Sequence, residues 1–133
     1  MNRSIIRLPE HTKCLAIDDN GLRLEWFIAK IPNCETAISP QEAVEILDTS
    51  KKFEIIFLDH DCDGKNFVDP TDPEFLNKSF WRVAMWLRRT KYDGIVIVHS
   101  GNPVGAARMA AEIGKTATVH VMPFGTFDIE VIP

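Results

Sequence analysis

The chain has 133 residues, of which 45% are hydrophobic and 26% are charged, and its formal net charge is −4. These values are typical of a globular domain that can bury a core, and we expect one soluble domain over residues 1–133. The acidic balance excludes bulk nucleic-acid binding through a broad basic surface. No apolar run approaches the roughly 20 residues of a membrane span. The three cysteines lack zinc-site spacing and favour the reducing cytoplasm.

Short apolar runs alternate with segments of helical spacing along most of the chain. Strands are predicted at 14–17, 35–38, 53–58, 94–98 and 118–122, and helices at 22–31, 40–47, 80–87 and 103–114, with a long polar loop at 62–78. This alternation implies right-handed crossovers and a mainly parallel sheet. The predicted fold class is α/β, a flavodoxin-like three-layer sandwich whose five-stranded sheet has the order 2-1-3-4-5, counted along the predicted strands.

The last segment, 124–133, is short and alternates apolar with polar residues. It lacks the pattern of a final helix, so we expect the C-terminal helix of such a sandwich to be missing. The segment runs as an extra strand, or it covers the sheet face that the helix would cover. If it does neither, an apolar face is left for a second copy of the chain in a homodimer.

Polar residues follow three of the predicted strands directly. They are Asp18 and Asp19 after the first strand, Asp59, His60 and Asp61 after the third, and His99 and Ser100 after the fourth. In an open parallel sheet, ligands bind beyond the carboxyl ends of the strands, where the strand order reverses. The sequence therefore predicts a functional site that these three segments build together.

The acidic residues of this site are predicted metal ligands. Asp18, Asp19, Asp59 and Asp61 would repel one another unless a hard divalent cation, magnesium or manganese, joined them. Other interpretations stay open, because Asp18 and Asp19 could cap the following helix and Asp61 could be a turn residue.

The histidines and the turn after the fourth strand suggest phosphate chemistry. His60 and His99 are candidates for proton transfer near neutral pH, or they are bonded to a neighbouring carboxylate. Ser100, Gly101 and Asn102 precede a helix, where a hydroxyl and free backbone N–H groups could bind phosphate. The alternative is a tight turn with a helix cap.

Two arginines, Arg23 and Arg108, fall in the first turns of the helices that border this crevice. Each could reach toward the site, although solvated arginines are the commoner case. Three tryptophans, Trp26, Trp81 and Trp86, fall within predicted helices, and we expect them to pack against the sheet.

Asp18-Asp19, Asp59 and Ser100 resemble the receiver domain of two-component response regulators. The resemblance implies that the acidic pair holds magnesium, that Asp59 accepts a phosphoryl group and that Ser100 senses it. Ordinary receivers carry a lysine before the proline that follows the fifth strand, whereas this chain has Met122. The missing cation argues against a conventional phosphorylation switch.

A narrower resemblance rests on Leu58-Asp59-His60-Asp61 and on residues 99–106, His-Ser-Gly-Asn-Pro-Val-Gly-Ala. The chain is similar over residues 13–123 to the cyclic-phosphate processing receiver domains. This implies a metal-assisted phosphoesterase for an RNA 2′,3′-cyclic end or a small cyclic nucleotide, with Asp59, His60 and His99 as catalytic residues. The alternative is an inactive receiver-like domain that binds a nucleotide or a protein partner without turnover.

Overall fold

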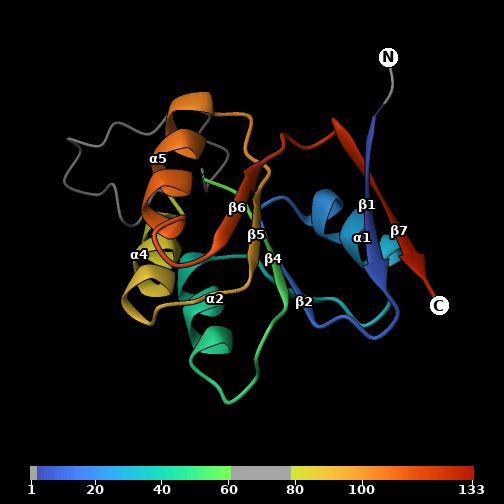
Figure 1. The fold of residues 1–133 in the computed structure, drawn as a ribbon, viewed down its shortest axis with the longest axis horizontal. Helices are drawn as coiled ribbons and strands as arrows, with labels where there is room; N and C mark the ends of the chain where they lie inside the picture. The colour runs from blue at the N-terminus through green and yellow to red at the C-terminus, as the bar shows by residue number, and fades with distance from the viewer. Residues whose placement is uncertain (1–2, 61–78) are drawn as a thin grey trace.

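The computed structural model describes residues 3–60 and 79–133, so Asp61 and the predicted loop at 62–78 lie outside the described residues (Figure 1). The central sheet has five parallel strands in the order β3-β2-β4-β5-β6. The strands are β2 (Cys14–Ile17), β3 (Glu35–Ala37), β4 (Ile55–Leu58), β5 (Ile95–Val98) and β6 (Thr118–Val121). The predicted α/β class and strand order are confirmed.

The central position of β2 and β4 follows from their composition. Every residue of Cys14–Ile17 and Ile55–Leu58 is buried, as expected of parallel strands that are covered on both faces. β6 is an edge strand with mostly exposed residues. A polar residue that directly follows either of these strands therefore lies next to the buried core.

Of the helices in residues 3–60 and 79–133, three cover one face of the sheet and a fourth lies on the other (Figure 1). They are α2 (Pro40–Leu47), α4 (Trp81–Arg89) and α5 (Pro103–Ile113) on the first face, and α1 (Gly21–Lys30) on the second. Each predicted helix starts within one residue of its observed start. Trp26, Trp81 and Trp86 pack against the core as expected. Among the described helices, none has the length and apolarity that crossing a membrane requires.

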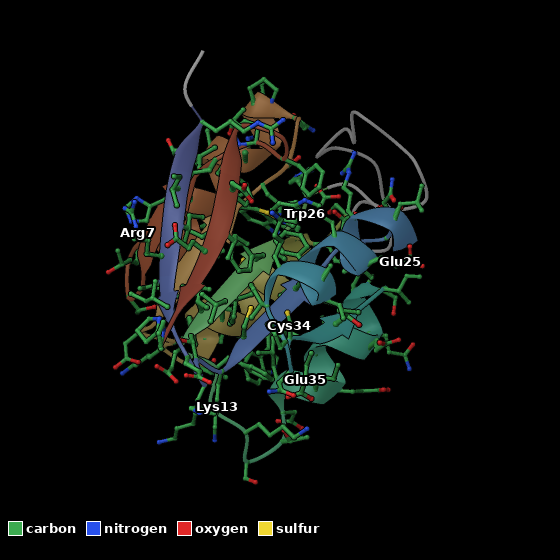
Figure 2. All side chains as sticks on the ribbon, turned by 90° about the vertical axis from the view of Figure 1, so that its right-hand side faces the viewer. Arg7, Lys13, Glu25, Trp26, Cys34 and Glu35 are labelled. Atoms are coloured by element: carbon green, nitrogen blue, oxygen red, sulfur yellow. The ribbon has the colours of Figure 1, made fainter. Side chains whose placement is uncertain are left out.

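The two ends of the chain pair with each other. β1 (Ser4–Pro9) and β7 (Phe127–Ile132) form a separate two-stranded parallel sheet, in which Ser4 lies opposite Phe127 and Pro9 opposite Ile132. Figure 2 shows this pair beside α1, with Trp26 on the helix. The extra strand at the C-terminal end is confirmed. The sequence missed β1, because only Leu8 in this strand is buried and its apolar pattern is weak.

The β1/β7 pair covers the sheet face that a final helix would otherwise cover. Phe127 and Ile129 are buried in one cluster with Phe27 of α1 and Phe57 of β4. The rings of Phe57 and Phe127 stack with centroids 6.1 Å apart, and Trp26 meets Phe127 edge-on at 5.9 Å. The condition on which the sequence predicts a homodimer, an uncovered apolar face, is therefore not met here.

Substitutions in this pair test its part in the core. Ile129→Ala removes a side chain that is 5% exposed, and we expect it to cost about 2–5 kcal/mol in the free energy of unfolding. Ile5→Ala is the matched control, because Ile5 is in the same two-stranded sheet but is 50% exposed; its expected cost is below about 1 kcal/mol. Urea denaturation measures both. Equal costs would mean that the pair does not close the core.

Candidate functional site

The backbone fixes three polar residues at the carboxyl edge of the sheet. Each parallel ladder continues one residue beyond its strand, so that the backbone N–H groups of Asp18, Asp59 and His99 donate to carbonyls of the neighbouring strand at 3.1, 3.0 and 3.0 Å. The predicted meeting of these segments is therefore observed. Because the hydrogen bonds belong to the sheet, the three Cα positions are as rigid as the core itself.

Three carboxylates gather there. One oxygen from each of Asp18, Asp19 and Asp59 can be chosen so that all lie within 4.8 Å of one another. Asp18 is fully buried and Asp59 is 5% exposed. The Oδ1 atom of Asp18 accepts from the backbone N–H of Asn20, and that of Asp59 accepts from the N–H of His60, both at 2.9 Å. The Oδ2 atoms of these two residues both lie near Nη1 of Arg23, at 3.5 and 3.8 Å.

The residue that caps α1 is Asn20, whereas the sequence suggested Asp18 or Asp19. The side chain of Asn20 accepts hydrogen bonds from the backbone N–H groups of Leu22 and Arg23. The interpretation of Asp18 or Asp19 as the helix cap is therefore wrong. Asn20 accepts the hydrogen bonds of the first helical turn, and the carboxylates of Asp18 and Asp19 lie in the cluster instead.

His99 is buried in contact with Asp18. Its Nε2 atom is 2.8 Å from Oδ2 of Asp18, and neither side chain is exposed. Within the described residues its Nδ1 atom has no hydrogen-bond partner. Burial lowers the pKa of His99, against the pull of Asp18. A neutral ring that donates its proton from Nε2 satisfies this geometry, and we assign that tautomer.

The two buried aspartates differ in acidity. Burial raises the pKa of Asp18, but hydrogen bonds from His99 and Asn20 and the charge of Arg23 outweigh it, so the pKa lies below its ordinary value. Burial first and the Asp18 charge second raise the pKa of Asp59 to about 8, although Arg23 and the His60 N–H oppose this. The cluster thus holds an ionised carboxylate beside one that keeps its proton near neutral pH.

Arg23 reaches the cluster from α1. Its Nη1 atom is 3.5 Å from Oδ2 of Asp18 and 3.8 Å from Oδ2 of Asp59. Its guanidinium also lies over the ring of Phe124, 5.5 Å from the centroid. Of the two interpretations of this arginine, the one in which it reaches the crevice is observed. Arg108 is exposed, as expected of a solvated arginine.

His60 packs against the start of α5. The residue is 2% exposed, and its carbonyl accepts from the backbone N–H of Phe80. A Cβ atom built on Gly105 would lie 2.6 Å from three atoms of the His60 ring. Glycine at 105 therefore makes room for this histidine, a role that the sequence did not reveal because the two residues are far apart along the chain.

The turn before α5 uses its polar groups internally. Oγ of Ser100 accepts from the backbone N–H of Asn102 at 3.0 Å, and Oδ1 of Asn102 accepts from the N–H of Gly105 at 3.0 Å. The turn and the helix cap are thus observed, while Gly101 is exposed and a Cβ there would meet no atom within 4 Å. The Ser100 hydroxyl keeps its own proton for donation.

The donor set fits a divalent cation. Three carboxylates close together are the hard oxygen ligands that magnesium and manganese prefer. The predicted ligands Asp18, Asp19 and Asp59 are brought together, and the fourth, Asp61, lies outside the described residues.

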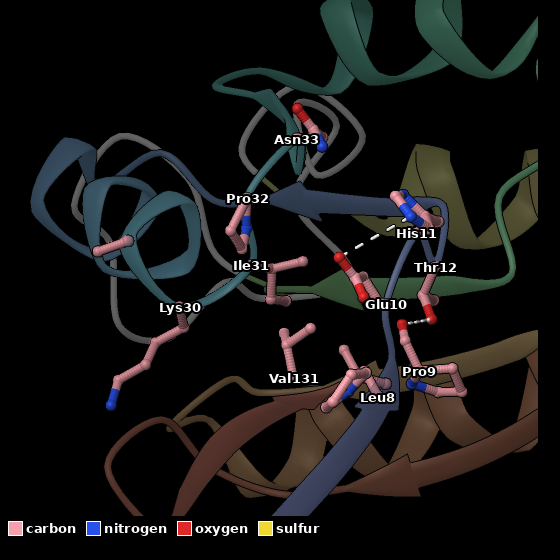
Figure 3. A pocket seen from close by; sticks show the side chains of 12 residues that line it. Leu8, Pro9, Glu10, His11, Thr12, Lys30, Ile31, Pro32, Asn33 and Val131 are labelled. Atoms are coloured by element: carbon pink, nitrogen blue, oxygen red, sulfur yellow. Dashed lines mark hydrogen bonds and ion pairs between the residues drawn. The ribbon is translucent and has the colours of Figure 1, made fainter.

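A hollow of about 490 Å³ lies at the other end of the sheet (Figure 3). Its walls include His11 and Thr12, which precede β2, and Pro32 and Asn33, which precede β3. These segments lie at the amino ends of the strands. This hollow is therefore separate from the carboxylate cluster, which lies at the carboxyl ends.

The contact between Gly105 and His60 can be tested by a double-mutant cycle. The clash in Gly105→Ala should cost about 1–3 kcal/mol of stability, although alanine favours a helix by up to about 1 kcal/mol. In a His60→Ala background the loss should largely disappear, because the ring is gone. Gly101→Ala is the control and should change stability by less than about 0.5 kcal/mol. Additive costs at 105 and 60 would contradict the contact.

The raised pKa of Asp59 predicts a pH dependence. Between the ordinary value of 3.8 and about 8, the folded protein keeps a proton that the unfolded chain releases. The contribution of Asp59 to stability is therefore complete below that window and is lost as the pH rises through it. Relative to Asp59→Asn, the wild type should lose stability across this range in urea denaturation. A ¹³C NMR titration of the Asp59 carboxyl should have its midpoint near the upper limit; a midpoint near the ordinary value would contradict the assignment.

Comparison with known proteins agrees with this geometry. The chain matches the family model of the cyclic-phosphate processing receiver domain over residues 15–115. Neither the curated proteins nor the solved structures give a significant match. The matched segment runs from β2 through α5, and it includes all three carboxylates of the cluster, His60 and His99. The chain therefore belongs to the family of cyclic-phosphate processing receiver domains.

Proposed function

We propose that this protein is a metal-assisted phosphoesterase that opens a cyclic phosphate. The observation that carries the proposal is the meeting of Asp18, Asp19 and Asp59 at one edge of the sheet, in a chain of this family. Three carboxylates beside a single arginine form an anionic site, which would repel a phosphate unless a cation were bound. Hydrolysis of a cyclic phosphate breaks one P–O ester bond and adds water, so it needs a proton acceptor and a proton donor.

The carboxylates would hold magnesium or manganese. Asp18 is oriented by His99 and by the N–H of Asn20, and Asp59 is oriented by the N–H of His60. Asp19 completes the described set, and Asp61 is the further ligand that we propose. The chemistry that a divalent ion supplies at such a site is charge for the phosphoryl oxygens and a lower pKa for nearby water.

His99 and His60 take different roles in this proposal. His99 is fully buried and bonded to Asp18, so we propose that it acts through Asp18 and does not touch the substrate. His60 is also buried, at 2% exposed, but its ring borders the first turn of α5 at Gly105, where we propose that the phosphate binds. His60 is the better candidate to exchange a proton with the substrate or with water, and Asp59 is the second.

The phosphate would bind at the start of α5. We propose the hydroxyl of Ser100 and the backbone N–H of Gly101 as donors, and Asn102 as the residue that holds this phosphate-binding turn, because its own N–H donates to Oγ of Ser100. This turn follows His99, which is the first residue after β5. Because His99 is hydrogen-bonded to Asp18, the turn adjoins the carboxylate cluster. A helix N-terminus carries partial positive charge and favours phosphate oxygens.

The proposed substrate is an RNA 2′,3′-cyclic end or a small cyclic nucleotide. With a net charge of −4 the chain offers no general attraction for a polyanion. A ligand that enters one local site is therefore favoured over a long nucleic acid.

The proposed location is the cytoplasm. This agrees with Cys14 and Cys34, which are free thiols in the structure although their Sγ atoms are 3.3 Å apart.

A second candidate is a receiver-like domain that binds a nucleotide or a protein partner without turnover. The burial of the polar groups favours it. His99 is 0% exposed, Ser100 is 2% exposed and Asn102 is 5% exposed, and the last two are engaged in the turn. Groups held in this way can recognise a ligand without exchanging protons with it.

Hydrolysis of a panel of 2′,3′-cyclic nucleotides, 3′,5′-cyclic nucleotides and cyclic dinucleotides decides between the two. We expect turnover of one class with magnesium or manganese, and none with EDTA. Asp59→Asn should lower kcat at least about a hundredfold, the order that one proton-transfer group contributes. Asp93→Asn is the matched control, because Asp93 is exposed and precedes the amino end of β5; its kcat should stay that of the wild type.

Two results would contradict the enzyme. The first is turnover that survives EDTA and Asp59→Asn, since the activity would then belong to a contaminant or to another site. The second is saturable binding in calorimetry with no hydrolysis of any compound in the panel. That second result would support the binding domain.

A further inference from the structure

Arg23 occupies the space between the two carboxylates that the proposed function assigns to a metal. One oxygen of each, Oδ1, is already bonded to a backbone N–H group. The Oδ2 atom of Asp18 lies 2.8 Å from Nε2 of His99 and 3.5 Å from Nη1 of Arg23, and the Oδ2 atom of Asp59 lies 3.8 Å from the same Nη1 atom. The two carboxylates that Arg23 contacts are therefore among those that would hold a divalent cation.

The contacts of Arg23 are those of an exchangeable partner. Both distances exceed the roughly 2.7–3.2 Å of a good hydrogen bond, so they reflect charge attraction without a fixed bidentate pair. The side chain is 37% exposed, whereas the Asp18 side chain is fully buried and that of Asp59 is 7% exposed. Solvent therefore reaches the guanidinium more readily than the carboxylates beneath it.

The arginine can leave the carboxylates without disturbing its helix. Its backbone N–H is held by the cap residue Asn20, which fixes the start of the side chain. Its guanidinium already rests on the ring of Phe124, at 5.5 Å, and this contact does not depend on the aspartates. The contact with this ring would remain if the guanidinium moved away from the two carboxylates.

We propose that Arg23 is the resident cation of this cluster and that it competes with a divalent metal ion for Asp18 and Asp59. In the metal-free protein Arg23 balances part of the buried negative charge. When a divalent ion binds, repulsion between the two cations moves the guanidinium away from the Oδ2 atoms. Arg23 thereby lowers the affinity of the site for metal. The inference rests on the metal site of the proposed function, and it adds a residue that regulates that site.

Calorimetric titration with Mn²⁺ tests the competition. Arg23→Gln removes the charge and should bind Mn²⁺ at least about tenfold more tightly than the wild type, because one elementary charge a few ångströms away is worth more than a factor of ten at intermediate dielectric. Arg108→Gln is the matched control. It removes the same charge from the exposed residue 108 of α5 and should bind Mn²⁺ within about twofold of the wild type, since screening weakens distant surface charges. Equal affinities for Arg23→Gln and the wild type would overturn the inference.

A second measurement covers the case in which Arg23→Gln fails to fold. In the wild type, the Nε–H signal of Arg23 in a ¹H–¹⁵N NMR spectrum should shift as Mg²⁺ is added, with the midpoint of a calorimetric titration of the same protein with Mg²⁺. A signal that stays unchanged at saturating Mg²⁺ would overturn the inference. Failure of the proposed function looks different, because all variants would then bind metal in the expected order yet hydrolyse nothing.

Discussion

The burial of the Asp18 carboxylate is the constraint on which the site depends. This side chain has no exposed surface, and an ionised group in such a place is costly unless it is bonded and compensated. Its partners come from three parts of the chain: His99 after β5, the backbone of Asn20 before α1, and Arg23 within α1. Each of these residues is positioned by the sheet or by a helix cap. The charge of Asp18 is therefore compensated only when the sheet and the start of α1 are both formed.

The consequence for Asp59 follows from the same charge. Asp59 is nearly as buried as Asp18 and lies beside it, so the two cannot both be ionised at low cost without another cation. Arg23 is the cation that the described structure provides, and it is shared between both. Arg23 thus compensates only part of the negative charge of these two aspartates. Uncompensated charge of this kind is common at sites that bind a charged ligand.

Much of this fold could be predicted from the sequence, because local signals agreed with the topology. Ile55–Leu58 is apolar throughout, Ser39-Pro40 opens a helix, and Asp18, Asp59 and His99 each follow a strand, so the meeting of these residues at one edge required only the parallel order. The role of Gly105 could not be predicted, and for Arg23 the sequence left two interpretations open, a reach toward the site or a solvated side chain. Each depends on a contact in space, with the ring of His60 and with two carboxylates, and no local pattern records such a contact. β1 was missed for a similar reason, because the strand with which it pairs in the described part of the chain is more than a hundred residues away, at Phe127–Ile132.

The pairing of β1 with β7 also bears on the order in which the core is built. Ser4 lies opposite Phe127, so these contacts join residues at the largest sequence separations in the described chain. Contacts of this kind form slowly, since the intervening chain must be ordered or looped first. The helical layer of α2, α4 and α5 can assemble from contacts that are shorter in sequence. The layer around Phe27 and Phe57 is completed by β7, so during synthesis on the ribosome it stays open to solvent until Phe127–Ile132 have emerged.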